Sequence, residues 1–235
     1  MADYSTVLVI SDTQSPHEHP DTLAFLSEIK KQFKPTFVLH IGDLGDFHSL
    51  NFHGVNPNLP SAHEELVQLR GFVKNLAKLF PCMTIVDSNH DALPKRKARS
   101  VGIPDEMLKD ERSLMQAPST WKYVKELVFK LPNGIWVKAK HNFGSNLFMD
   151  CIKQGISMIC GHLHTKSNIN WGMNCFHQHY FSMQVGCLIN KPHPAFEYAD
   201  NNATEEVLSC GIIKGGIPII VPMYQNKHGR WKGFI

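Results

Sequence analysis

The sequence lacks the long apolar run that a membrane helix needs. No stretch approaches the ~20 consecutive apolar residues that span a bilayer. The first apolar run, residues 6–10, has no basic flank and is too short for a secretory signal. Cysteine is scarce, with six residues and no C-x-x-C pair, so we expect reduced core thiols rather than a disulfide framework or a thiolate zinc site. We therefore expect no membrane association.

The sequence also lacks a strong charge bias and any repeat, linker or low-complexity tract. Its 24 Lys+Arg and 21 Asp+Glu leave a net charge of +3, too small to indicate nucleic-acid binding by itself. With 43% apolar residues in 235, the chain can bury a substantial core. We predict one domain over residues 1–235. Histidine is abundant, at 14 copies, and the positions of these residues indicate which of them could be functional.

Alternating strands and helices are predicted for the first part of the chain. Short apolar runs bounded by polar residues indicate buried strands at 6–10, 36–41, 83–86 and 156–160. Helical spacing, a Ser61–Glu64 capping box and a closing Gly155 indicate helices at 21–33, 61–80, 104–115 and 145–154. This order predicts a parallel sheet with right-handed crossovers.

The later part of the chain has the sequence pattern of a second β-sheet. Residues 124–131 and 135–140 flank a Pro-Asn-Gly turn, which indicates a hairpin. Further β-like runs follow at 176–185, 211–221 and 231–235. We expect these segments to form a largely antiparallel sheet packed on the first.

Polar clusters follow four of the predicted strands, at the point where each strand ends. Strand ends of this kind meet at one edge of an α/β sheet, where ligands bind. Each cluster alone is typical of an ordinary turn, but four in the same topological position predict a shared site. Their oxygen and nitrogen ligands, without thiolate, suit manganese, iron, zinc or magnesium. The clusters are Asp12-Thr13-Gln14, Gly42-Asp43-Leu44-Gly45-Asp46, Ser88-Asn89-His90-Asp91 and Gly161-His162-Leu163-His164.

These clusters, with a lone His141, resemble the calcineurin-like metallophosphoesterase superfamily. The pattern of that superfamily is D-x-H, G-D-x-x-D, G-N-H-[DE], a lone His and G-H-x-H. The resemblance covers residues 6 to about 165. It implies an α/β fold, a four-layer α/β-β/α sandwich of two mixed sheets with flanking helices.

The resemblance also implies a dinuclear metal site. Two divalent ions are expected, manganese first, with iron, zinc, nickel or magnesium as alternatives. Such ions polarise a phosphoryl group and supply hydroxide at neutral pH. His90 is then the general acid, with Asp91 orienting its ring. The implied ligands are Asp43 as the bridge, Asp12, Gln14 and His164 at the first ion, and Asn89, His141 and His162 at the second.

Two positions depart from the superfamily pattern. Ser88 replaces a glycine, and serine is tolerated in most turns. Gln14 replaces a histidine. A carboxamide oxygen is a weaker ligand than an imidazole, so the first ion is bound loosely or His17 or His19 replaces Gln14. The remaining alternative is a degenerate member that binds metal as a scaffold without turnover.

Two residues near the predicted metal ligands favour a phosphodiester substrate. Phe47 stands where phosphatase relatives carry an arginine after G-D-x-x-D, and the third motif ends in Asp91 instead of glutamate. We therefore expect hydrolysis of DNA, RNA or a nucleotide by a cytoplasmic enzyme of a bacterium or phage, with a phosphomonoesterase as the alternative. No glycine-rich nucleotide-binding motif stands at a strand end. His48 and His53 in the loop after Asp46, and Arg96 in a basic run, could contact substrate or simply pack or face solvent.

Overall fold

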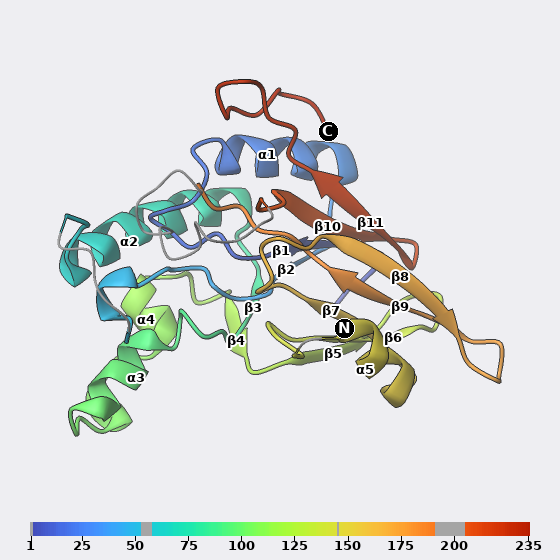
Figure 1. The fold of residues 1–235 in the computed structure, drawn as a ribbon, viewed down its shortest axis with the longest axis horizontal. Coiled ribbons are helices and arrows are strands. Elements are labelled where there is room, and N and C mark those ends of the chain that lie inside the picture. The colour runs from blue at the N-terminus through green and yellow to red at the C-terminus, as the bar shows by residue number, and fades with distance from the viewer. Residues whose placement is uncertain (1, 53–57, 145, 191–204) are drawn as a thin grey trace.

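The structure is a computed structural model that describes residues 2–52, 58–144, 146–190 and 205–235. Its described elements are helices arranged around two β-sheets (Figure 1). None of the described helices is long and apolar enough to cross a membrane. The helices are α1 (Thr22–Phe33), α2 (Ala62–Leu79), α3 (Leu93–Ser100), α4 (Glu111–Met115) and α5 (Leu147–Gln154), with 3-10 turns at η1 (His48–Leu50) and η2 (Asp105–Met107).

The first sheet is mixed and has the strand order β11-β10-β1-β2-β3-β4. Strands β1 to β4 pair in parallel, as the crossover pattern predicts, while β10 runs antiparallel to β1 and β11 antiparallel to β10. These strands are β1 (Thr6–Ile10), β2 (Phe37–His40), β3 (Thr84–Val86), β4 (Lys122–Val124), β10 (Ser209–Lys214) and β11 (Ile217–Pro222).

The second sheet is also mixed, in the order β5-β6-β7-β9-β8. Its central pairs, β6–β7 and β7–β9, are parallel, and its outer pairs are antiparallel. Its strands are β5 (Leu127–Lys130), β6 (Trp136–Ala139), β7 (Ser157–Cys160), β8 (Asn168–Met173) and β9 (His179–Gln184).

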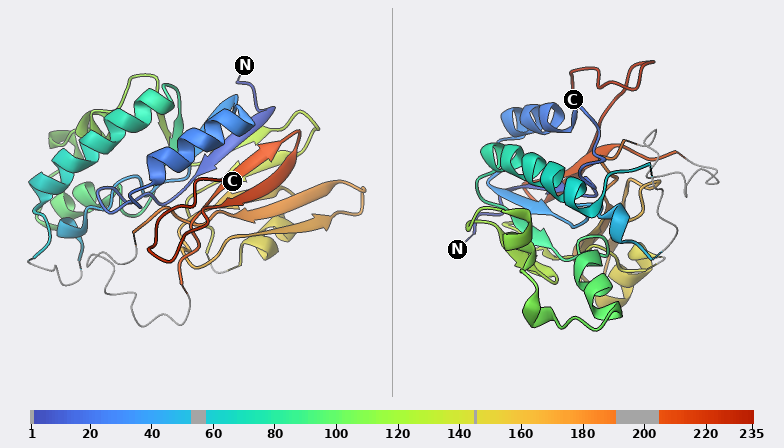
Figure 2. Two further views of the ribbon diagram at one scale, coloured as in Figure 1. Left: turned by 90° about the horizontal axis from the view of Figure 1, so that it is seen from above. Right: turned by 90° about the vertical axis from the view of Figure 1, so that its left-hand side faces the viewer.

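Strand β1 shows how the layers are held together. Its side chains alternate between the two faces of the sheet, and both faces are buried. Leu8 and Ile10 pack into the core beneath α1 and α2, whereas Val7 and Val9 pack into a second core against the other sheet. Figure 2 shows α1 and α2 on one side of the first sheet, with the second sheet and α5 on the other. The predicted architecture of two mixed sheets with flanking helices is confirmed.

Several local predictions are also confirmed. The four predicted strands form β1, β2, β3 and β7, and the Pro-Asn-Gly turn joins β5 to β6. Ser61 caps α2 through the expected reciprocal bonds with Glu64. Gly155 ends α5 in the left-handed conformation. Residue 145 of that predicted helix lies outside the described residues.

Other local predictions are wrong. Residues 104–115 do not form one helix, because Asp110 starts α4 afresh by accepting a hydrogen bond from the Ser113 amide. The run 211–221 is a hairpin that pairs with β1 in the first sheet, not with the second sheet. The second sheet has parallel pairs at its centre. Residues 231–235 form no strand.

Candidate metal centre

The predicted site residues lie at the carboxyl ends of strands from both sheets. Asp12 and Gln14 follow β1, Asp43 follows β2, and Asn89 follows β3 in the first sheet. The second sheet contributes side chains that follow β6 and β7. We call the whole set the strand-end centre: Asp12, Gln14, Asp43, Asn89, His141, His162 and His164.

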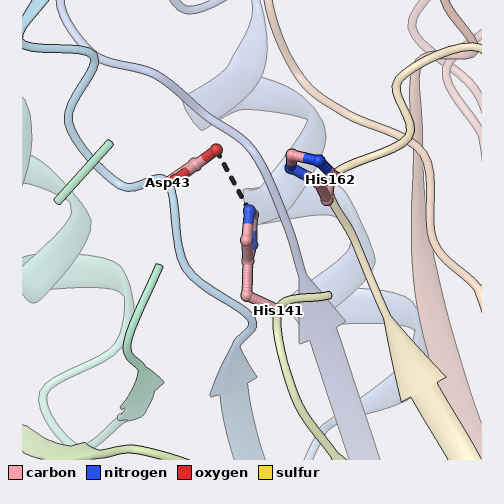
Figure 3. A group of neighbouring side chains, drawn as sticks. All are labelled: Asp43, His141 and His162. Carbon is pink, nitrogen blue, oxygen red and sulfur yellow. Dashed lines mark ion pairs between the residues drawn. The ribbon is translucent and has the colours of Figure 1, made fainter. Parts of the chain in front are cut away.

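Asp43 is the meeting point of one half of this centre. His141 Nε2 lies 3.2 Å from Asp43 Oδ2 and 2.9 Å from Asn89 Oδ1. The His162 ring lies beside the His141 ring, with centroids 5.1 Å apart (Figure 3). His141 Nδ1 donates a hydrogen bond of 2.7 Å to the carbonyl of Ile41, so Nε2 is the nitrogen held toward Asp43. An imidazole anchored in this way is typical of a metal ligand.

Asp12 is the meeting point of the other half. His164 Nε2 lies 3.2 Å from Asp12 Oδ1, and Gln14 Nε2 lies 3.5 Å from the same histidine nitrogen. The amide of His162 donates to Asp12 Oδ2 at 2.9 Å, which ties the two halves together. The structure therefore brings all seven residues of the predicted ligand set into one place.

The structure places Gln14, not His17 or His19, beside His164. The His19 ring lies 2.8 Å from the carbonyl of Gly229, near the C-terminal segment. The His17 ring lies with two carboxylates away from this contact. The alternative in which either histidine replaces Gln14 is thus not what the geometry shows.

Backbone conformation marks the same residues. Asp12, Gln14, Asp43 and His162 have φ of 49°, 45°, 52° and 71°, a region that non-glycine residues rarely occupy. The cost of such conformations is met only where the surroundings fix them, as at functional sites. Close packing helps to fix the conformation of Asp12. The backbone of Gly161 lies so near Ser11 and Asp12 that a side chain at Gly161 would collide with them.

Ser88 supplies another part of the fixing. Its hydroxyl accepts a hydrogen bond of 2.7 Å from the Asp43 amide and donates one of 2.9 Å to Asp91 Oδ2. A glycine at this position would make neither bond. Ser88 departs from the superfamily pattern, but its two hydrogen bonds help to hold Asp43 and Asp91 in place.

The electrostatics of the centre favour a bound cation. Burial raises the pKa of the Asp43 carboxyl, but the facing His141 and His90 outweigh it and hold that pKa well below its usual range. Burial lowers the pKa of His141, and the Asp43 carboxylate reverses this and raises it to about 9. A field that holds extra protons on imidazole also attracts divalent cations.

Two buried oxygens are left for such a cation. Gln14 Oε1 has no hydrogen-bond partner among the described residues, and Asp43 Oδ2 has only its ion-pair contact with His141 Nε2. Buried polar atoms of this kind are rare unless water or an ion satisfies them. With mixed carboxylate, amide and imidazole donors, the strand-end centre fits divalent metal ions.

His90 lies beside this centre, and its orienting carboxylate is Asp46. His90 Nδ1 lies 3.0 Å from Asp46 Oδ1 and 2.8 Å from the Asp46 carbonyl oxygen. Its amide donates to Asp43 Oδ1 at 3.0 Å. Burial lowers the pKa of His90, but Asp43 and Asp46 together raise it to about 10.

The expectation that Asp91 orients the His90 ring is wrong. The Asp91 carboxylate instead accepts hydrogen bonds from the amides of Leu44 and Gly45, at 3.1 and 2.9 Å, besides that from Ser88. Burial and the nearby Asp43 raise the pKa of Asp91 to about 6. Asp91 thus holds the loop that carries Asp43 and Asp46, rather than the imidazole.

The predicted substrate residues have different surroundings. His48 is 8% exposed, and its amide donates to Glu65 Oε1, so its position is that of a packed residue. His53 lies outside the described residues. Arg96 is exposed on α3, and its guanidinium lies 5.2 Å from the centre of the Phe52 ring. Within the basic run, Lys95 pairs with Glu111 and Arg99 with Asp105.

Asp46 belongs to the G-D-x-x-D pattern, but the sequence predicts no role for it. Asp46 and Asp91 are both carboxylates of the resembling motifs, and the prediction chose Asp91 where the structure has Asp46 facing His90. It also missed Glu65, whose carboxylate joins Asp46 near His17. Glu65 lies in the first turn of α2, where an acidic residue is expected for helix stability and gives no functional signal.

Comparison with protein families gives a match over most of the chain. The model of the calcineurin-like phosphoesterases matches residues 5–180, which include all seven residues of the strand-end centre. A comparison with curated proteins found no match.

Comparison with solved structures finds similarities at low sequence identity, of which the one to Vps29 shows a shared fold. Vps29 of Chaetomium thermophilum has a TM-score of 0.51 and 12% identity, covering 97% of this chain and 94% of its own. The nuclease MPE of Pseudomonas putida has a TM-score of 0.37 and 14% identity, covering 92% and 86%. A phosphatase of Mycoplasma pneumoniae has a TM-score of 0.36 and 9% identity, covering 92% and 93%.

Proposed function

Because this chain belongs to the calcineurin-like phosphoesterase family, we propose that its strand-end centre is the active site of a metal-dependent phosphodiesterase acting on nucleic acid or nucleotides. The observation that carries the proposal is the convergence of five other polar side chains around the buried carboxylates of Asp12 and Asp43. Asp43, Asn89, His141 and His162 would hold one ion. Asp12, Gln14 and His164 would hold the other, with Asp43 shared.

The ions would withdraw electrons from the phosphoryl group and make a water molecule acidic enough to attack it at neutral pH. The chain's own residues supply the remaining steps. The carboxylates of Asp43 and Asp12 would supply the negative charge that holds the ions in the strand-end centre. His141 is kept in the right orientation by the Ile41 carbonyl, and manganese is the ion we favour for this set of donors.

His90 is placed to protonate the leaving oxygen. With Nδ1 bound to Asp46, its Nε2 is the nitrogen left to face a substrate, and its side chain is 21% exposed. The Asp43 carboxylate gives the largest upward contribution to the pKa of His90. Cations bound at Asp43 would offset that charge, which brings the pKa of His90 down toward the range where a general acid works best.

The surroundings of His90 favour a diester over a monoester. Phe47, at the position where phosphatase relatives carry an arginine, is 3% exposed and packs into the core beneath α1 and α2. This position therefore offers no cation for the second negative charge of a monoester. Arg96 and Lys97 lie against Phe52, with cation-to-ring distances of 5.2 and 5.0 Å, and such a basic and aromatic surface suits a nucleic-acid strand.

The test compares kcat/KM for bis(p-nitrophenyl) phosphate and p-nitrophenyl phosphate in the presence of Mn²⁺, followed by assays on single-stranded and double-stranded DNA. We expect the diester to be preferred and cleavage of DNA to weaken with added salt, because phosphate contacts are screened. The matched control is Arg96→Ala, which should lower DNA cleavage more than hydrolysis of the small diester. A clear preference for the monoester would make the protein a phosphatase.

A scaffold without turnover is the second candidate, favoured by Gln14 alone. A neutral carboxamide beside His164 weakens the first ion site, and one weakly held ion would leave binding without catalysis. The same assays separate the two functions. A scaffold would bind Mn²⁺ and hydrolyse neither ester.

A further inference from the structure

A second group of metal-ligating side chains lies buried behind His90. We call it the inner cluster: His17, Asp46 and Glu65. His17 comes from the loop after β1, Asp46 from the loop after β2 and Glu65 from the first turn of α2. Their side chains are only 1–3% exposed, and one ligand atom of each lies within 4.8 Å of the others.

The separations within the inner cluster are longer than those of charge-assisted hydrogen bonds. His17 Nε2 lies 3.5 Å from Asp46 Oδ2 and 3.6 Å from Glu65 Oε1. Charge-assisted hydrogen bonds are about 2.7–2.9 Å long. Ligands bound tetrahedrally at about 2.0–2.2 Å from a metal lie about 3.3–3.6 Å apart. The two separations that involve His17 match the edges of a tetrahedral metal site.

The remaining atoms of both carboxylates already have fixed partners. Asp46 Oδ1 faces His90, and Glu65 Oε2 accepts from the Ser49 amide at 3.0 Å and from the Ser49 hydroxyl. Asp46 Oδ2 is buried and has no hydrogen-bond partner among the described residues. An orphaned carboxylate oxygen aimed at a histidine and a second carboxylate is the arrangement that a cation satisfies.

Charge leads to the same conclusion. Asp46 and Glu65 place two carboxylates together with side-chain exposures of only 3% and 2%, and burying charges together is unfavourable unless a positive charge compensates them. The His90 ring faces Asp46 Oδ1 and is not paired with Glu65 among the described residues, so it compensates one of the two charges at most. A divalent cation compensates both charges at the separations observed.

We propose that His17, Asp46 and Glu65 bind a third divalent cation, zinc by preference, at a site separate from the strand-end centre. One nitrogen and two carboxylate oxygens leave a fourth position for water, the usual completion of a three-ligand zinc site. Since Asp46 also holds His90, the ion fixes the carboxylate on which the orientation of His90 depends. The proposal is independent of which ester the protein hydrolyses.

The metal content of the purified chain tests this directly. The protein is stripped with chelator, loaded with Zn²⁺ alone, desalted and analysed by plasma mass spectrometry. We expect about three zinc ions per wild-type chain, and about two in Glu65→Gln and in His17→Ala, since each variant removes one ligand of a three-ligand site. Asp43→Asn should keep the inner ion while losing zinc from the strand-end centre.

His19→Ala is the matched control, because His19 is a buried histidine two residues away whose ring contacts Gly229 instead of the cluster. It should keep the wild-type zinc content. Two ions in the wild type, with no further loss in either inner-cluster variant, would overturn the proposal. If the variants fail to fold, a zinc-edge anomalous map of wild-type crystals decides, since it must show a peak between His17, Asp46 and Glu65.

Discussion

The strand-end centre and the inner cluster use the same kinds of ligand in different surroundings. In both, histidine and carboxylate atoms from separate loops and helices meet at separations of 3.2 to 3.6 Å. At the strand-end centre His164 is 17% exposed and the neighbouring His90 is 21% exposed, whereas the inner side chains are 1–3% exposed. Of these two regions of the described chain, only the strand-end centre therefore has side chains that are partly open to solvent. The proposed roles follow this difference, with substrate at the first region and positioning of His90 at the second.

Asp43→Asn should produce the largest effect, because it removes the charge shared by the two ions of the strand-end centre. We expect loss of both ions and a fall in kcat/KM of at least ~10³, the scale of losing metal charge stabilisation. Metal analysis and diester hydrolysis are measured on the same sample. Full activity, or an unchanged Mn²⁺ content, would show that the ions are not held at Asp43.

His90→Ala should come next and should act on chemistry alone. Loss of a general acid lowers kcat by ~10²–10⁴. The Mn²⁺ content should stay at the wild-type value, because His90 binds Asp46 and is not among the proposed ligands. A variant that loses its metal together with its activity would make His90 a ligand.

Asp46→Asn should have an intermediate effect that joins the two regions. The amide keeps the shape of the side chain but removes the charge that faces both His90 and His17. Residues that orient an active group typically contribute 10–100-fold, so we expect kcat to fall by about that factor while the strand-end ions remain.

Asp91→Asn is the control for Asp46→Asn. Asp91 binds the amides of Leu44 and Gly45 and the hydroxyl of Ser88, so this change should chiefly lower the free energy of unfolding, by ~1–3 kcal/mol in urea denaturation. A larger fall in kcat for Asp91→Asn than for Asp46→Asn would reverse the two roles.

Gln14→His should produce the smallest change and should increase affinity. An imidazole beside His164 is a stronger ligand than a carboxamide, so the Kd for the more weakly bound Mn²⁺ should fall, and activity should survive dialysis better. Calorimetric titration of the metal-free protein measures this. Unchanged affinity for both ions would mean that residue 14 is not a ligand.

The features that sequence predicted correctly are those in which local chemistry and tertiary structure agree. Strand β1 is a continuous apolar run because both of its faces are buried, and Ser61 signals the start of α2 through its capping box. That the seven residues of the strand-end centre lie together was predictable, because each stands directly after a strand or at the family's motif position.

The features that sequence missed depend on contacts between distant segments. The charged run Leu93–Ser100 forms α3 although only Leu93 and Ala98 are buried, so no apolar face announced the helix. Strand β8 is a largely exposed edge strand that depends on pairing with β9. The inner cluster is assembled from three elements, and no spacing in the sequence reveals it.

The most direct test of the central claim, that the strand-end centre is a metal-dependent hydrolytic site, is a titration of Mn²⁺ into the metal-free protein while hydrolysis of bis(p-nitrophenyl) phosphate and p-nitrophenyl phosphate is followed. We predict no turnover without metal, and a rate that rises with occupancy of the strand-end centre and is absent in Asp43→Asn. The claim is contradicted if the fully loaded wild type hydrolyses neither ester, or if the metal-free protein hydrolyses them equally well.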